Sequence, residues 1–211
     1  MKTRIHKMLL WITLLGVTSA ASSLGQGVVS FNNLIAGAPV TISTAAGSFN
    51  PNDGPPGAFV GSSYSVSLLF VNGTVTSQAA FDGLSPIWVR DAIFLGTTGT
   101  GPGHGINGDG SGFFDGGSAR LTGQTDFNVT VQIRAWYNGG GAYTSYGQAL
   151  AAGHNVGLSN LLPMYVPPPP GPTINLDGLQ LFTVGIPEPS SISLILLGLL
   201  SLTIFRRQRN I

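Results

Sequence analysis

The sequence predicts an all-β fold, a β-sandwich of short antiparallel strands with one short helix. Three observations support this prediction. Residues 127–137 alternate between apolar and polar side chains with a period of two. Asn72-Gly73 is a strong short-range hairpin signal. The 31 glycines and 14 prolines among 211 residues divide the middle of the chain into short segments, as in a sandwich, without reaching the level of low-complexity disorder.

The clearest strand covers residues 127–137. Its apolar side chains, such as Val131 and Ile133, are expected on one face, and Thr130 and Gln132 on the other. Residues 64–71 form a second strand, which the Asn72-Gly73 turn joins to a return strand at 74–76. Five further strands are expected at residues 28–31, 40–42, 87–95, 119–122 and 179–184.

One helix is expected near residues 145–152, where good helix formers precede Gly153, which suits the C-terminal cap. It should cover an edge or one end of the sandwich. The proline-rich segment 167–172 is expected to be a loop rather than a stiff linker, because residues 179–184 still have the pattern of a core strand after it.

Charged residues make up only 8% of the chain and are unevenly distributed. Between the basic residues of the two chain ends, three arginines stand against seven aspartates and Glu188, so no surface that could follow a phosphate backbone is available. Nucleic acid is therefore excluded as a partner. The absence of cysteine excludes disulfides and thiolate metal sites.

The first 25 residues have the pattern of a secretory signal peptide. Basic residues within 1–7 precede an apolar run at 8–17 and then small residues. Signal peptidase could cut after Ala20 or after Gly25, and an uncleaved membrane anchor is the alternative. In each case the general secretion machinery exports the domain expected at residues 26–185.

Residues 186–211 contain three ordered elements: Pro187-Glu188-Pro189, an uncharged apolar run at 192–205, and a basic cluster of Arg206, Arg207 and Arg209. As a helix the run would span about 21 Å, short for a ~30 Å hydrocarbon core, but flanking serines and snorkelling arginines extend it. A transmembrane helix is therefore expected at about 190–205. The arginines should stay cytoplasmic, which puts Pro187 on the outer side with the domain.

This tail resembles the PEP-CTERM sorting signal of Gram-negative bacteria, although Gln208 interrupts the arginine cluster. The resemblance implies that exosortase, an integral-membrane transpeptidase, recognises Pro187, Glu188 and Pro189 and processes the tail. It also implies export across the inner membrane, transient membrane anchoring, and delivery to the cell surface or extracellular matrix. Proteins with this signal are associated with exopolysaccharide and biofilm matrix, and some ice-binding proteins carry it. An ordinary anchoring helix that is never cut is the alternative.

The domain is similar, more loosely, to secreted PEP-CTERM proteins in which a QGxVxFxN segment, a VQIRAW-like strand and a GLQ-F strand recur. Here these are residues 26–33, 131–136 and 178–182. The resemblance implies a common fold and carries no activity with it.

Patterns typical of catalysis or ligand binding are weak. The spacing of Asn107, Asp109, Ser111 and Asp115 is similar to that of a calcium loop, but Ser118 stands where the bidentate glutamate belongs. Weak calcium binding and a plain solvated turn both remain open. No catalytic residue, cofactor or firm metal site is expected, because most aspartates adjoin glycine, as in turns.

Trp88, Trp136 and three tyrosines could offer aromatic faces to a sugar, although such residues more often pack in a core. Trp136 lies on the polar side of its strand, so a sugar contact is predicted there. The sequence favours a non-catalytic structural or adhesive protein of the surface or polysaccharide matrix. The alternative is a surface-anchored carbohydrate-binding or carbohydrate-cleaving β-sandwich module.

Overall fold

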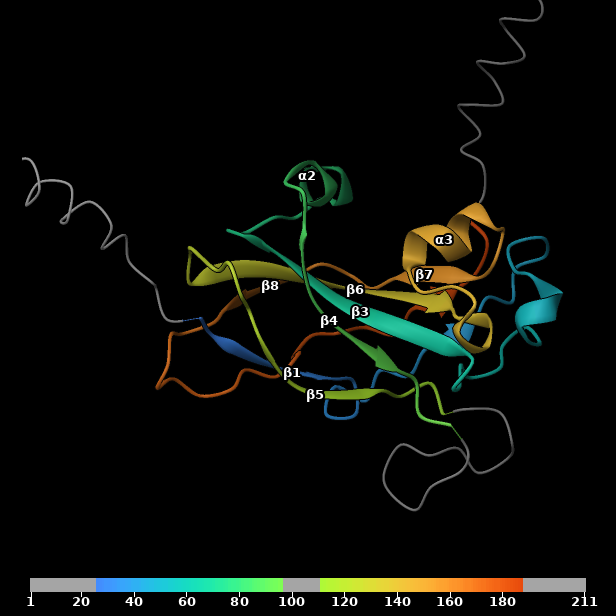
Figure 1. Cartoon of the computed structure of the whole chain (residues 1–211), viewed down its shortest axis with the longest axis horizontal. Helices are drawn as coiled ribbons and strands as arrows, with labels where there is room; N and C mark the ends of the chain where they lie inside the picture. Colours follow the sequence, from blue (N-terminus) through green and yellow to red (C-terminus); the bar gives the residue numbers. More distant parts are fainter. Residues whose placement is uncertain (1–25, 97–110, 188–211) are drawn as a thin grey trace, which may run out of the picture.

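A computed structural model describes residues 26–96 and 111–187 of the chain, and most of its regular structure is β-strand (Figure 1). The predicted β-rich fold is thus confirmed. The strands are β1 Val28–Asn32, β2 Thr41–Ile42, β3 Tyr64–Asn72, β4 Ile87–Ile93, β5 Asp115–Arg120, β6 Asn128–Tyr137, β7 Val156–Leu158, β8 Leu162–Tyr165 and β9 Thr183–Val184. The helices are η1 Pro51–Asp53, α2 Gln78–Gly83, η2 Gly139–Gly141 and α3 Tyr146–Ala151.

The strands form one larger sheet and two small ones. The larger sheet has five strands in the order β4-β3-β6-β7, with β8 also pairing with β6, and all its pairs are antiparallel. β1 pairs antiparallel with β5, and β2 pairs parallel with β9. In Figure 1 the β1–β5 pair lies below the larger sheet, while α2 and α3 lie above it.

One apolar core fills the space between the larger sheet and the β1–β5 pair. We call the side of the sheet that faces this core the inner face, and the opposite side the outer face. Leu68 and Phe70 from β3 and Ile133 from β6 are fully buried on the inner face, where they belong to the same cluster as Phe31 from β1 and Ala119 from β5. The apolar alternation predicted for residues 127–137 is confirmed on this face.

The outer face of the sheet is covered at two places by short helices. Phe81 of α2 packs with Val71 and Val75, and Ala149 of α3 packs with Trp136 and Val156. These two clusters are separate from the main core. Where a helix covers the sheet, the side chains on both of its faces are therefore shielded from solvent.

Helix α3 confirms the helix predicted near residues 145–152. The Ser145 hydroxyl accepts a hydrogen bond from the backbone N–H of Gln148 at 3.3 Å, and Gly153 takes a positive φ of 74° after the helix. The helix lies against β6 and the edge strand β7. Helix α2 was not predicted, although Ser77 caps it in the same way by accepting from the N–H of Ala80.

The return strand predicted at residues 74–76 is wrong. After Gly73, which has a φ of 88°, the chain forms α2 and only then returns antiparallel to β3 as β4. The backbone N–H of Val75 donates instead to the Thr130 hydroxyl at 2.8 Å. Strand β3 ends at Asn72 and the chain bends at Gly73, but no hairpin forms there, because the partner strand comes later in the chain.

Other predicted elements are changed in extent. The strand expected at 119–122 lies at Asp115–Arg120, and the one expected at 179–184 is reduced to Thr183–Val184, although Leu179 and Phe182 are buried. Residues 167–172 form a loop, as predicted. Strands β7 and β8, with three and four residues, were not predicted because runs that short show no clear period.

Candidate functional site

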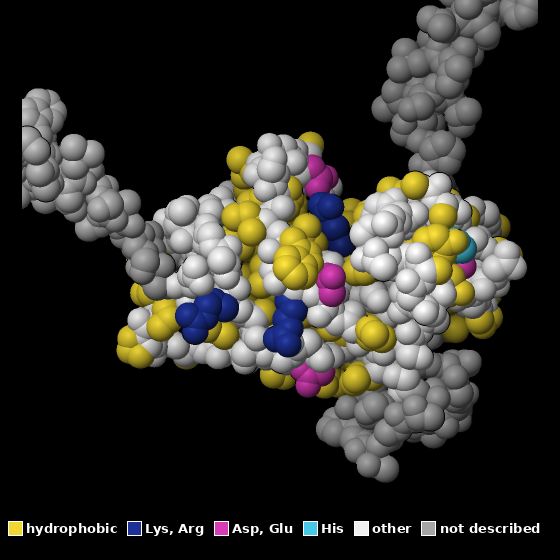
Figure 2. Space-filling view, viewed as in Figure 1, with side chains coloured by type: hydrophobic (Ala, Val, Ile, Leu, Met, Phe, Trp, Pro, Cys, Tyr) yellow, Lys and Arg dark blue, Asp and Glu magenta, His cyan; other side chains and the backbone are white. Residues whose placement is uncertain are grey.

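Between α2 and α3, the outer face of the sheet carries a cross-strand row of polar residues. Asp91 of β4 lies opposite Ser67 of β3, and Ser67 lies opposite Arg134 of β6. The Ser67 hydroxyl donates to Asp91 Oδ1. Figure 2 shows hydrophobic, acidic and basic side chains gathered over this part of the molecule. The middle of the outer face is therefore chemically unlike its two helix-covered ends.

Arg134 links this row to both helices. Its Nη2 donates to Asp82 Oδ1 of α2 at 2.6 Å, and its guanidinium carbon lies 5.7 Å from the centre of the Tyr146 ring of α3. Burial raises the pKa of Tyr146, while Arg134 acts in the opposite direction. The Arg134 charge is thus shared between an ion pair and a cation–π contact, and it stabilises the position of both helices.

A β-bulge brings Trp88 and Asp91 to the same face. Residues three apart in a regular strand point to opposite faces, but Leu68 and Leu69 pair with Arg90 and Trp88, so Val89 is an extra residue in β4. As a result Trp88 Nε1 donates to Asp91 Oδ1 at 2.8 Å. Trp88 is 60% exposed, so its ring is fixed by a hydrogen bond and still open to solvent.

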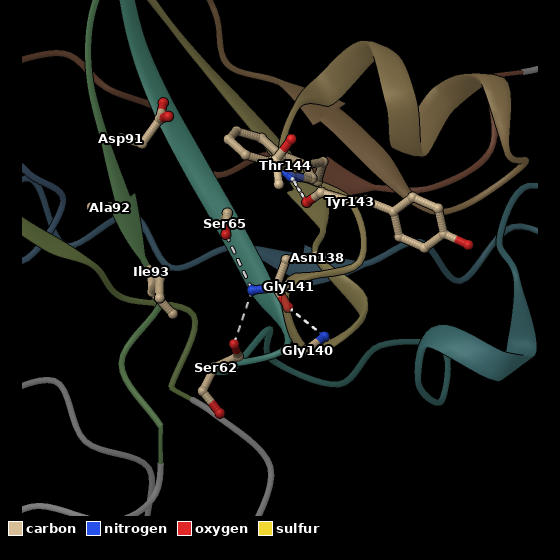
Figure 3. A pocket seen from close by; sticks show the side chains of 11 residues that line it. Ser62, Ser65, Asp91, Ala92, Ile93, Asn138, Gly140, Gly141, Tyr143 and Thr144 are labelled. Atoms are coloured by element: carbon tan, nitrogen blue, oxygen red, sulfur yellow. Dashed lines mark hydrogen bonds between the residues drawn. The ribbon is translucent and has the colours of Figure 1, made fainter.

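A cavity of about 490 Å³ adjoins Asp91 on the outer face. Figure 3 shows Asp91 and Ile93 of β4 on one side of it, Gly140 and Gly141 on the other, and Ser65 between them. The two glycines have φ values of 68° and 101°, a backbone conformation that other residues rarely adopt. Because they carry no side chain, this wall of the cavity is backbone.

Asn138 fixes the shape of that wall. Its Nδ2 donates to the Ser62 carbonyl and to Ser65 Oγ, each at 3.1 Å, and its Oδ1 accepts from the N–H of Gly140 at 2.9 Å (Figure 3). The side chain is only 6% exposed, so these bonds form away from solvent. The glycine loop is therefore held in place before any ligand arrives.

A second polar cluster is buried at the start of β3. Asp53 Oδ1 lies 2.8 Å from His154 Nδ1, and Oδ2 accepts from the backbone N–H of Asn155 at 2.7 Å. The Tyr64 hydroxyl donates to the Asp53 carbonyl and accepts from Asn155 Nδ2. Burial raises the pKa of Tyr64, because the phenolate would lie in the core. Both Asp53 oxygens bind structural partners, and the cluster ties η1 to β3 and to the start of β7.

The predicted sugar contact at Trp136 does not fit the structure. Trp136 is 2% exposed, packs against Ala149 and Val156, and donates from Nε1 to the Tyr143 carbonyl at 3.0 Å. The side of β6 that looked polar in the sequence is covered by α3, so the face of the ring is not open to a sugar, although part of Trp136 lines the cavity beside Asp91. The structure favours the core-packing alternative for this residue.

Two of the four residues of the predicted calcium loop, Asn107 and Asp109, lie outside the described residues. Of the other half, Ser111 Oγ accepts from the N–H of Phe113 at 3.4 Å, and Asp115 Oδ1 accepts from the N–H of Gly117 at 2.9 Å. Within residues 26–96 and 111–187, no group of three or more His, Cys, Asp or Glu side chains could hold a metal ion. Calcium binding stays a prediction.

Most of the predicted targeting segments also lie outside the described residues. These are the signal peptide at 1–25, Glu188 and Pro189 of the sorting motif, the helix at about 190–205 and the terminal arginines, Arg206, Arg207 and Arg209. Pro187 is described and is exposed. No helix in the described part of the chain is long and apolar enough to cross a membrane.

No protein-family model, curated protein or solved structure matches the chain. The sequence pointed to Trp88 only as one of several aromatic residues, and it gave no sign that Trp88 and Asp91 meet. Trp88 and Asp91 are three positions apart, and in a regular strand they would point to opposite faces. Only the bulge brings both side chains to one face, so the sequence did not reveal the pair.

Proposed function

We propose that this chain is an exported cell-surface or extracellular-matrix protein of a Gram-negative bacterium, and that exosortase processes its C-terminal signal. Its domain, residues 26–185, is a β-sandwich with a structural or adhesive role and no catalytic one. The ordered tail at 186–211 carries the proposal, because a proline-rich motif, an apolar run and a basic cluster occur in that order behind a signal-peptide pattern.

The connection between domain and tail supports processing at the motif. The backbone N–H of Ile186 donates to the Ser48 carbonyl at 2.8 Å, and the next residue, Pro187, is exposed. The packed domain thus extends to the residue before Pro187. An enzyme can reach Pro187 without unfolding the domain, as a membrane transpeptidase would require.

The arrangement of the layers supports a β-sandwich. The five-stranded sheet lies over the β1–β5 pair, and both contribute side chains to one apolar core. β2 and β9 pair with each other, and their buried residues Ile42 and Val184 belong to the same cluster. These are the features expected of two β-layers that share a core.

The surroundings of the carboxylates support a non-catalytic role. A glycosidase needs a pair of carboxyl groups, one to protonate the leaving group and one to act as base or nucleophile. Asp53 is bonded to His154 and to the backbone of Asn155, and Asp82 is paired with Arg134. The hydrogen-bonding capacity of these two carboxylates is used within the fold, and Asp91 is the single acidic side chain among the described residues that line its cavity, which favours binding or structure over cleavage.

The sorting proposal can be tested by changing the motif in the native host. The triple variant P187A/E188A/P189A should remain in the inner-membrane fraction, while the wild-type protein reaches the surface or the medium. The variant S191A, which alters the tail just after the motif, is the control and should travel like the wild type. Equal distribution of the triple variant and the wild type would contradict the proposal.

A further inference from the structure

The outer face of the larger sheet has an aromatic ring, a carboxylate and a cavity in one place. Trp88 is 60% exposed, and its indole N–H is bonded to Asp91. Asp91 in turn lines the cavity of about 490 Å³ between β4 and the glycine loop. A single exposed tryptophan needs no explanation, but this one is oriented by a residue that belongs to a cavity.

The carboxylate is held ready to accept further hydrogen bonds. Asp91 Oδ1 accepts from both the Ser67 hydroxyl and Trp88 Nε1. In the described part of the chain no group bonds to Asp91 Oδ2, and the residue is exposed. Oδ2 is thus an oriented, charged acceptor that a ligand hydroxyl can bind strongly.

The lining of the cavity indicates the class of ligand. Around Asp91 it presents the hydroxyl oxygens of Ser62 and Ser65 and the backbone of the glycine loop, and its aromatic lining comes from Trp136 and Tyr143. Asp91 is the single charged side chain among the described residues that line it, so an anionic group would be repelled. Hydroxyl donors and acceptors beside an exposed aromatic ring match a molecule with an apolar face and a hydroxyl-rich edge.

We propose that this surface binds a neutral polysaccharide, with one sugar in the cavity against Asp91 and another stacked on the ring of Trp88. The choice of a polysaccharide rests on the proposed function, which delivers the domain to a carbohydrate-rich matrix. The contacts involve hydrogen bonds and stacking only. Asp91 acts as an acceptor and transfers no proton, which agrees with a non-catalytic domain.

The site is preorganised rather than assembled on binding. Ser67 fixes Asp91, Asp91 fixes Trp88, and Asn138 fixes the glycine wall through Ser62, Ser65 and Gly140. Because these bonds already exist in the free protein, little side-chain entropy remains to be lost when a ligand binds.

Affinity gel electrophoresis with defined polysaccharides tests the proposal. The full chain, purified in an amine-oxide detergent that contains no sugar, is run through native gels with dextran, hydroxyethyl cellulose or galactomannan. Alginate serves as the acidic polysaccharide. The wild type should be retarded by at least one neutral polymer and not by alginate. W88A and D91A should each weaken that binding by about tenfold or more, which corresponds to about 1.4 kcal/mol.

The matched control is F59A, which removes another exposed aromatic ring that lies beside β2 and does not line the cavity. It should bind like the wild type. Far-UV circular dichroism of W88A should still show the β-sheet spectrum of the wild type, because the ring is mostly in solvent. If none of the neutral polysaccharides changes the gel mobility of the wild-type protein, the proposal is overturned. A protein partner would then be the occupant to test for this surface. Undiminished binding by W88A, or equal retardation by alginate, would also overturn the proposal.

The binding test and the sorting test can fail independently of each other. Binding is measured on purified protein, so it does not depend on sorting in the host. A sorted protein that fails to bind contradicts only the polysaccharide site, and a binding protein that is never processed contradicts only the sorting proposal.

Discussion

Strand β6 has two sides that differ in chemistry. On the inner side Val129, Val131 and Ile133 are fully buried among other apolar side chains. On the outer side Gln132 and Arg134 bond to Gln78 and Asp82 of α2. The same ten residues thus supply an apolar core on one side and a polar layer on the other, where Gln132 is fully buried and Arg134 is 22% exposed. The difference indicates that stability comes mainly from the inner side, while the open part of the outer face lies on β4, where Trp88 and Asp91 are exposed.

The largest expected effect lies on the inner face. F70A removes a fully buried ring and should lower the free energy of unfolding by about 3–5 kcal/mol. W88A, on the outer face of the neighbouring strand, should change it by less than about 0.5 kcal/mol because its ring is mostly exposed. Chemical denaturation of both variants and of the wild type measures the two changes in the free energy of unfolding. Similar losses of stability in F70A and W88A would show that the inner and outer faces contribute equally to stability.

An intermediate effect is expected at high pH from Tyr64. Its pKa is raised in the folded state by burial, so the folded protein holds the phenol proton more tightly than the unfolded chain. The stabilisation is complete below about pH 10, the pKa of an ordinary tyrosine, and is lost as pH rises above it. Titration of Tyr64 should lower the free energy of unfolding by at most about 1.4 kcal/mol per pH unit.

The variant Y64F separates this contribution from other high-pH effects. It should be less stable than the wild type near pH 7, because Asn155 Nδ2 and the Asp53 carbonyl lose a partner. Its stability should then decline less steeply above pH 10. Thermal unfolding between pH 7 and pH 11 measures both slopes. Parallel curves for the two proteins would contradict a raised pKa at Tyr64.

The smallest effect is expected for the Asp82–Arg134 ion pair on the outer face. The two side chains are 51% and 22% exposed, so solvent screens the pair and its coupling should be about 0.2–1 kcal/mol. A double-mutant cycle with D82N and R134Q measures this coupling, which should decrease when salt is added. A coupling above about 3 kcal/mol would mean that the outer face contributes to stability as the inner face does.

The elements best predicted from the sequence are those set by local pattern. The alternation at residues 127–137 identified β6, and good helix formers followed by Gly153 identified α3. Asn72-Gly73 identified the end of β3 and a bend, but not the hairpin predicted there. It could not reveal that α2 intervenes before the partner strand, because strand pairing is decided by contacts distant in sequence.

The candidate site was largely beyond prediction for the same reason. Trp136 looked accessible because its strand neighbours are polar, yet α3 folds over it. Trp88 and Asp91 looked incompatible with one face because the spacing hides the bulge at Val89. Both outcomes depend on tertiary packing, which leaves no signature in a single strand.

The central claim is that the chain is exported and its tail is processed, and one measurement tests it most directly. The intact mass of the protein recovered from the envelope and medium of its native host is compared with the exosortase gene present and deleted. We predict loss of residues 1–20 or 1–25 in both strains. Loss of the apolar run and terminal arginines should occur only when the gene is present. A protein that keeps Arg206, Arg207 and Arg209 in both strains would contradict the claim and show a simple membrane anchor.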